Sequence, residues 1–299
     1  MKRIMLLILI VNTVSLAVAQ TVAPEERTRA NEYFEAGNWP QVVISYQSIA
    51  KREPQNSNAR MRAGIGLLNQ TKTQVAITQL EEAVALGANP MPLFYLSTAY
   101  AQSNQPDKCF ETLEKSLANG FTALTLFETD VNLARVKSNP RYETLHERLL
   151  RGVYPCRYSE QSRQFDFWIG EWDVKSPTGQ PAGKSKIELL LGECVIYENW
   201  TSAAPQNYAG KSFNLYNSGT GKWMQTWVDD KGAVIEFIDG EYKDNKMVFV
   251  TQPDNQNQVT RLTFFNLDKN NVRQLFEVTS DAGKTWTTTT DLLYHRVQK

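Results

Sequence analysis

The sequence is poor in the residues that build most catalytic and metal sites. Its 299 residues include two histidines, His146 and His295, and three cysteines, Cys109, Cys156 and Cys194. No spacing of His, Cys, Asp and Glu is typical of a bound metal ion, and the sequence has neither a glycine-rich phosphate loop nor a nucleophile elbow. A catalytic thiol needs a base beside it, and the two histidines lie in different halves of the chain. These absences argue against the common metal, nucleotide and thiol enzymes.

Net charge and long apolar runs are also lacking. The 32 basic residues balance 32 acidic ones, and no basic stripe runs along the chain, so we expect no nucleic-acid partner. After residue 19, no segment approaches the roughly 20 apolar residues that a membrane-spanning helix needs. We therefore expect no membrane insertion once the N-terminus has been processed.

The first 19 residues have the pattern of a cleavable export signal. Lys2 and Arg3 form a positive n-region, an apolar run follows at residues 4–11, and residues 17–19 supply the small side chains of a cleavage site. The apolar run is too short for the alternative, an uncleaved membrane anchor. We expect a soluble mature protein that is exported, either to a bacterial periplasm or out of the cell.

The periodicity of the apolar residues changes near residue 155. Before this point they recur at helical spacing, and after it they alternate at strand spacing. Six of the seven tryptophans lie in the second part. The sequence therefore predicts a multidomain α plus all-β chain: a signal peptide (1–19), helical repeats with a helical cap (20–150), a linker (151–164) and an antiparallel β domain (165–299).

One helix-pair pattern recurs in the first part. A small or medium residue of each second helix falls at intervals of 34 and 33 residues, at Val42, Ala76 and Cys109. A bulky residue follows four positions later in each, at Tyr46, Leu80 and Leu113. Over about residues 26–150 this pattern resembles the tetratricopeptide repeat. The resemblance implies an α-helical solenoid that binds a protein or peptide partner; the alternative is that the array packs only against its own β domain.

Strand-like runs follow one another through the second part, separated by turn sequences. They begin at Phe165, Lys184, Val195, Lys211, Trp223, Val234, Met247, Gln258, Val272 and Thr285. Eight to ten short strands joined by hairpin turns predict an antiparallel barrel or sandwich. The regular up-and-down spacing favours the barrel, because closure leaves no exposed sheet edge.

The opening of the β part carries a second resemblance. Residues 165–174 read FDFWIGEWDV, an FDFWxGxWDV motif, and GKSFNLY and WMQTWVD follow at residues 210–216 and 223–229. Over about residues 156–299 the chain resembles a family of uncharacterised bacterial domains with a lipocalin-like (calycin-like) barrel. Gly170 and Trp172 are similar to the Gly-x-Trp of lipocalins. The resemblance implies that Trp172 closes one barrel end beneath an arginine of the last strand, for which Arg296 is the candidate.

Alternation places aromatic and polar side chains on one face of three neighbouring strands. The set consists of Glu198, Trp200, Ser212, Asn214, Tyr216, Trp223, Gln225, Trp227 and Asp229. An aromatic lumen with a few converging polar groups is typical of a small-molecule pocket. We therefore predict a non-enzymatic barrel that binds a small, partly apolar ligand. The set can instead contact the helical domain, or face solvent while Phe213, Leu215, Met224 and Val228 form a dry core.

Three other hypotheses remain open for the β domain. It is an enzyme of hydrolase or isomerase type, with acid–base groups among Glu198, Asp229 and Tyr216. It is an interaction scaffold without a ligand. It binds haem through His295, near the end of the last strand; otherwise we expect no cofactor.

The cysteines predict one disulfide. Cys156 and Cys194 both belong to the β part of an exported chain, where a pair of cysteines tends to be oxidised. Cys109 stands at the small position of the third repeat, and we expect it to be a buried free thiol.

Overall fold

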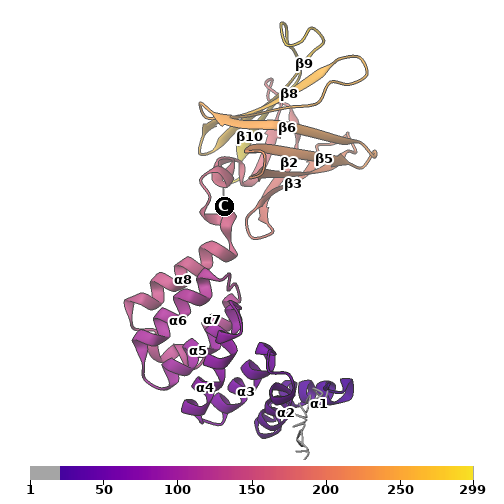
Figure 1. The fold of residues 1–299 in the computed structure, drawn as a ribbon. Coiled ribbons are helices and arrows are strands. Elements are labelled where there is room, and N and C mark those ends of the chain that lie inside the picture. The colour runs from indigo at the N-terminus through magenta and orange to yellow at the C-terminus, as the bar shows by residue number, and fades with distance from the viewer. Residues whose placement is uncertain (1–20, 299) are drawn as a thin grey trace, which may run out of the picture. The chain divides into compact units, whose positions relative to one another are not determined.

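The computed structural model describes residues 21–298, so the predicted signal peptide (1–19) lies outside the described residues. The chain divides into two compact units, Met1–Leu149 and Leu150–Lys299. Figure 1 shows that the first unit is built of helices and the second of strands. None of the helices described is both long and apolar enough to cross a membrane.

The helical unit consists of paired helices followed by a shorter cap. Its elements are α1 (Pro24–Glu35), α2 (Trp39–Arg52), α3 (Ser57–Asn69), α4 (Thr73–Ala85), α5 (Pro90–Gln102), α6 (Pro106–Ala118), α7 (Leu124–Thr129), the 3-10 helix η1 (Leu133–Val136) and α8 (Pro140–Val153). Consecutive helices from α1 to α6 pack on one another, and α3 also packs on α5. The helix-pair repeat predicted from the sequence is confirmed.

Small residues allow these helices to approach closely. Ala76 and Cys109 are completely buried, as is the larger Val42. An added Cβ at Gly64 would lie only 2.6 Å from the Cγ of Leu80, so a larger residue in α3 would push α4 away. The 34-residue spacing of the sequence thus reflects a repeated packing requirement.

The β unit, described as far as residue 298, is a closed antiparallel barrel of ten strands. They are β1 (Gly170–Lys175), β2 (Pro181–Leu190), β3 (Val195–Ser202), β4 (Ala209–Asn217), β5 (Lys222–Asp229), β6 (Val234–Lys243), β7 (Lys246–Val250), β8 (Val259–Asp268), β9 (Asn271–Thr279) and β10 (Thr287–Arg296). Each strand pairs with its neighbours in sequence, and β1 pairs with β10 to close the ring. The prediction of an up-and-down barrel is confirmed.

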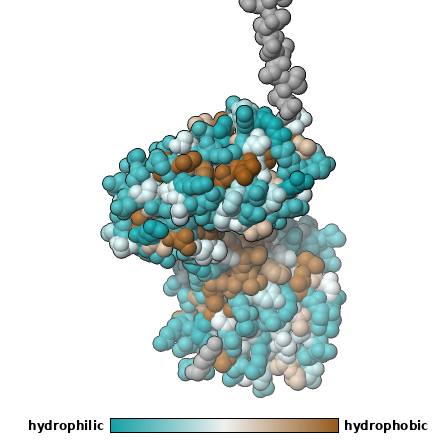
Figure 2. All heavy atoms as spheres, turned by 90° about the horizontal axis from the view of Figure 1, so that it is seen from below, coloured by the Kyte–Doolittle hydropathy of each residue, from teal (hydrophilic) through white to brown (hydrophobic). Residues whose placement is uncertain are grey.

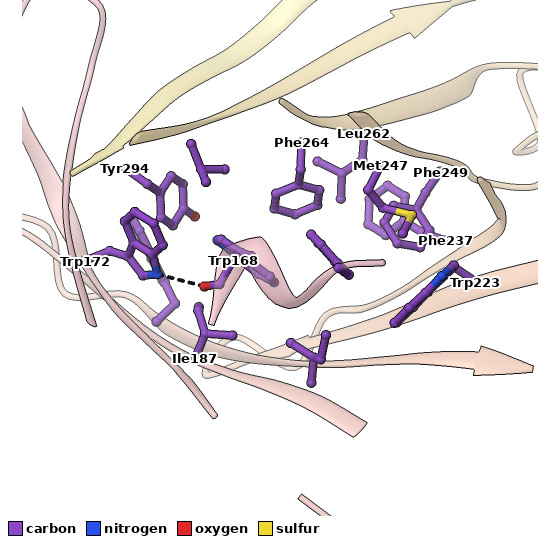
Figure 3. Close-up of a cluster of buried hydrophobic side chains, with 14 of the residues drawn as sticks. Trp168, Trp172, Ile187, Trp223, Phe237, Met247, Phe249, Leu262, Phe264 and Tyr294 are labelled. Carbon is purple, nitrogen blue, oxygen red and sulfur yellow. Dashed lines mark hydrogen bonds between the residues drawn. The ribbon is translucent and has the colours of Figure 1, made fainter. Parts of the chain in front are cut away.

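The first strand begins later than the sequence predicts. The expected start at Phe165 is wrong, because Asp166–Trp168 forms a short 3-10 helix, η4, and β1 starts at Gly170. Phe165 and Trp168 are completely buried, and their rings stack at 5.1 Å. Figure 3 shows η4 among the buried side chains between the strands. We call residues 165–168 the aromatic plug. As a strand, this segment would alternate its side chains between the core and solvent, whereas the 3-10 turn leaves the large rings of Phe165 and Trp168 inside the barrel, where they are more stable.

Trp172 and Arg296 complete this end of the barrel. The Trp172 side chain is buried, and its Nε1 donates a hydrogen bond of 2.8 Å to the carbonyl oxygen of Trp168 (Figure 3). The Arg296 guanidinium lies 4.2 Å from the centroid of the Trp172 ring and donates to the carbonyl oxygen of Ile169 at 2.6 Å. An added Cβ at Gly170 would lie 2.1 Å from Arg296 Nη1, so glycine leaves the space that the arginine occupies.

The predicted disulfide between Cys156 and Cys194 is confirmed, with a Cα–Cα distance of 5.0 Å. It ties the predicted linker (151–164) to the turn between β2 and β3. That segment contains the end of α8 and two 3-10 helices, η2 (Pro155–Tyr158) and η3 (Gln161–Arg163). Cys109 is a buried free thiol, and burial raises its pKa to about 12.

Replacing Trp172 by alanine should destabilise the barrel. We expect Trp172→Ala to lower the free energy of unfolding by about 3–5 kcal/mol, because a large buried ring is removed. Phe213→Ala is the control, since Phe213 is 40% exposed on the outer face of β4. Denaturant unfolding followed by tryptophan fluorescence measures the β unit, where six of the seven tryptophans lie. Equal midpoints for the two variants would contradict a closing role for Trp172.

Removing the disulfide should also destabilise the β unit. The free energy of unfolding of the Cys156→Ser/Cys194→Ser double variant should be about 4 kcal/mol lower than that of the wild type, because the unfolded chain gains conformational entropy once the loop is open. Cys109→Ala, in the helical unit, is the control and should leave barrel unfolding unchanged. In the denatured, unreduced wild type only the Cys109 thiol should react; three reactive thiols would show that the bond is not formed.

Candidate ligand-binding site

The nine residues predicted to line the lumen lie on neighbouring strands whose register brings them together. In this register Glu198 of β3 is opposite Ser212 of β4, which is opposite Trp227 of β5. Most of the set is buried, namely Glu198, Trp200, Ser212, Asn214, Trp223 and Gln225. The alternative of a dry core formed by the opposite face is wrong, because Phe213 of that face is 40% exposed.

The barrel interior contains a cavity of about 650 Å³. Its mouth lies at the turns that follow β1 and β3, and the aromatic plug fills the other end, where β1 begins. The walls combine apolar and polar side chains. Trp200, Trp227, Phe237, Phe276 and Leu292 supply rings and an aliphatic chain, and Glu198, Gln225, Gln274 and Thr290 are among the polar residues. Four of the nine predicted residues line it: Glu198, Trp200, Gln225 and Trp227.

Two glycines make room for the tryptophans of the wall. An added Cβ at Gly210 would lie 2.1 Å from Trp227 Cζ2, and one at Gly183 would lie 2.7 Å from Trp200 Cη2. Real side chains do not approach so closely, so each indole lies against bare backbone of the adjacent strand. The glycines therefore keep the indoles against the wall and the cavity open.

A buried carboxyl group lies at the inner part of the cavity. Glu198 is 2% exposed; Ser185 Oγ donates to its Oε1 at 2.8 Å and Ser212 Oγ to its Oε2 at 3.0 Å. Burial raises the pKa of Glu198 to about 7, against the opposing effect of hydrogen bonds from Ser185, Ser212 and Tyr294. The group therefore changes charge near neutral pH.

Hydrogen bonds extend from this carboxyl group across the barrel. Asn214 Nδ2 donates to Ser212 Oγ at 3.0 Å, and Gln225 Nε2 donates to Asn214 Oδ1 at 2.6 Å. Tyr294 donates to Gln274 Oε1 at 2.9 Å, and burial, with the charge of Glu198, raises its pKa well above the usual value. We call this network the polar belt: Ser185, Glu198, Ser212, Asn214, Gln225, Gln274 and Tyr294.

The groups of the enzyme hypothesis do not share the cavity. Of Glu198, Asp229 and Tyr216, only Glu198 lines it. Asp229 accepts from the Tyr208 hydroxyl at 3.0 Å, and a hydrogen bond from the Ala233 amide is the main cause that lowers its pKa. Tyr216 packs on the aromatic core. Among the side chains described along the cavity, Glu198 is the single carboxyl group.

His295 lies outside the barrel. It is exposed, next to the inward-facing Tyr294 on β10, and its Nδ1 is 2.8 Å from Asn271 Oδ1. A haem held by His295 would therefore not occupy the cavity. Within residues 21–298, no group of three or more His, Cys, Asp and Glu side chains is placed to hold a metal ion.

Sequence reasoning missed the part of the site that comes from the other strands. Ser185 of β2, Gln274 of β9 and Tyr294 of β10 belong to the polar belt. The sequence of β10 contained a signal for part of this, because every second residue, Thr290, Leu292 and Tyr294, lines the cavity. The pairing of the last strand with the first, which brings these residues to the site, is not visible in a local pattern.

No protein-family model and no curated protein matches the chain. Three similar solved structures each cover less than half of it. The TPR2B domain of yeast Sti1, in complex with pHsp70, is 20% identical, with 42% of this chain and 93% of that one covered and a TM-score of 0.32. MamA is 15% identical, with 42% of this chain and 75% of that one covered and a TM-score of 0.37. The Yersinia enterocolitica translocator chaperone SycD is 13% identical, with 43% of this chain and 86% of that one covered and a TM-score of 0.31. Similarities this low carry no conclusion about function.

The stability of the barrel should decrease as the pH rises from 5 to 8. The folded state binds the Glu198 proton more tightly, because burial raises the pKa from 4.5 to about 7. The stability gained from protonation is complete below pH 4.5 and is lost as the pH passes through 7, a change of up to about 3 kcal/mol.

Glu198→Gln should flatten this pH profile, measured by urea unfolding at pH 5, 6, 7 and 8. Glu236→Gln, which removes an exposed carboxylate from the outer face of β6, is the matched control and should keep the wild-type slope. The assignment is wrong if Glu198→Gln retains the slope of the wild type.

Proposed function

We propose that this chain is an exported, non-enzymatic binding protein whose lipocalin-like barrel holds a small, partly apolar molecule. The observation that supports this most is the 650 Å³ cavity, whose lining combines aromatic and aliphatic side chains with several polar ones. Its volume falls within the roughly 300–1,000 Å³ of small-molecule sites in proteins.

The construction of the cavity supports binding without a large rearrangement. Most of its wall comes from strands of a closed ring, which hold their side chains in fixed register. Residues 203–206 and 208, at the mouth between β3 and β4, are the main loop contribution. A preformed site loses less conformational entropy on binding than one that must be ordered first.

Export is proposed from two independent features. The N-terminal pattern is that of a signal peptide, and the Cys156–Cys194 bond is of a kind that persists in oxidising compartments. We place the mature protein in a bacterial periplasm or outside the cell.

For the helical unit we propose a protein or peptide partner, because stacked helix pairs present an extended surface to other chains. Figure 2 shows the lobe that carries the grey N-terminal trace; its visible face is largely hydrophilic, with apolar side chains in separate groups. Ile44 and Val75, on the second helices of two pairs, are 61% and 51% exposed. Exposed apolar side chains scattered in this way are ordinary for a protein surface and do not form a large apolar interface.

Ligand binding can be tested with the neutral dye Nile red and the full mature chain. Thr290 lines the cavity near its mouth, whereas its neighbour Thr289 does not. We expect Thr290→Trp to weaken dye binding at least about tenfold because the new ring occupies the cavity. Thr289→Trp should bind like wild type, and unfolding midpoints would confirm that both variants are folded.

Native mass spectrometry of protein taken from its own exported fraction is the second measurement. A small adduct that leaves on denaturation is expected for the wild type and should be reduced in Thr290→Trp. Absence of dye binding by the wild type, or equal binding by the two variants, would overturn the proposed function.

A further inference from the structure

We propose that the cavity selects an apolar amine, a molecule with an aromatic or aliphatic body and one protonated nitrogen seated against Glu198. The inference rests on the small-molecule function proposed above and names the chemical class of the ligand. It is carried by the charges, hydrogen-bonding groups and rings that line the cavity.

The charge of the lining favours a cation over an anion. Glu198 is its single acidic side chain, and no lysine, arginine or histidine is found among the described residues that line the cavity. A buried carboxylate or phosphate on the ligand would therefore find no cationic partner and would face Glu198. Burying a charge without a partner is strongly unfavourable, so the cavity should reject fatty acids and other anions.

The carboxyl group of Glu198 retains capacity for a further donor. Ser185 and Ser212 each donate one hydroxyl to its oxygens, and the Tyr294 hydroxyl lies within reach of it as well. A carboxylate offers about four acceptor positions, so at least one is left for a ligand. The serines belong to β2 and β4, on either side of β3, so they hold the carboxylate in place. An ammonium group has three donors, and Gln274 of β9 and Tyr294 of β10 provide further oxygens along the cavity.

The rings of the wall favour a cation over a neutral donor. Trp200 and Tyr294 lie beside Glu198 along the cavity, with ring centroids 6.4 Å apart. Trp227 and Phe237 line it as well. The face of an aromatic ring attracts a cation, and tryptophan does so most strongly. An alcohol could donate to Glu198 but would gain neither the ion pair nor the attraction to the rings.

Three probes with one aromatic body separate these possibilities. They are 2-(1-naphthyl)ethylamine, 2-(1-naphthyl)ethanol and 3-(1-naphthyl)propionate, titrated by calorimetry into the full mature protein at pH 8, where Glu198 is largely ionised. We expect the amine to bind at least about tenfold more tightly than the alcohol, and the carboxylate to bind most weakly.

Glu198→Gln should remove the preference, so that the amine and the alcohol bind with similar affinity. Glu236→Gln keeps the cavity intact while changing net charge by the same amount, and should keep the wild-type order. Circular dichroism checks the fold of both variants, and the order of the three probes on the wild type tests the proposal even if Glu198→Gln does not fold.

The outcomes separate this inference from the function on which it rests. Equal or tighter binding of the carboxylate or the alcohol by the wild type would overturn the amine preference and leave a small-molecule site. A preference for the amine that persists in Glu198→Gln would also overturn it. If none of the three probes binds while Nile red does, the amine class is wrong; if Nile red fails too, the proposed function falls with it.

Discussion

The β unit depends on the way one end of its barrel is filled. A ring of ten strands encloses more space than its own side chains occupy, so an unfilled interior would expose apolar surface to water. The aromatic plug fills one end, with the Trp172 indole bonded to its backbone and the Arg296 guanidinium stacked outside. Because this filling stops partway along the barrel, the remaining interior becomes the cavity. Closure and ligand space are therefore two results of the same packing.

The polar belt separates the dry end of the barrel from the open end. A chain selected for stability alone would gain by replacing Glu198 with an apolar residue, since burying a carboxyl group is costly even when it is hydrogen-bonded. Local rules of core construction are broken in proteins mainly where function requires it. The hydrogen bonds of the belt come from serines, amides and a tyrosine of five strands, β2, β4, β5, β9 and β10, so its geometry depends on the closed ring.

The structural features that could be predicted from the sequence are those that depend on residues close together in the chain. The helix pairs were visible because one packing requirement recurs at Val42, Ala76 and Cys109, and the face of Glu198 and Trp200 was visible because strand alternation has a period of two. The fold of Phe165–Trp168 was missed, since an apolar run reads equally as a strand or as a buried turn. Ser185 and Tyr294 were missed because strand pairing around a closed ring is a long-range property. The burial of Glu198, and with it the charge behaviour of the site, depends on that ring.

Gly183 and Gly210 give the cavity an unusual form of adjustability. Neither glycine lines it, yet each determines where an indole of the wall rests. A methyl group at Gly210 would displace the Trp227 ring while leaving every lining residue unchanged; one at Gly183 would meet the Thr201 carbonyl oxygen at 2.5 Å as well as the Trp200 ring. A substitution at a glycine behind the wall can therefore change which molecules fit the cavity. Two related chains with identical lining residues need not share a ligand.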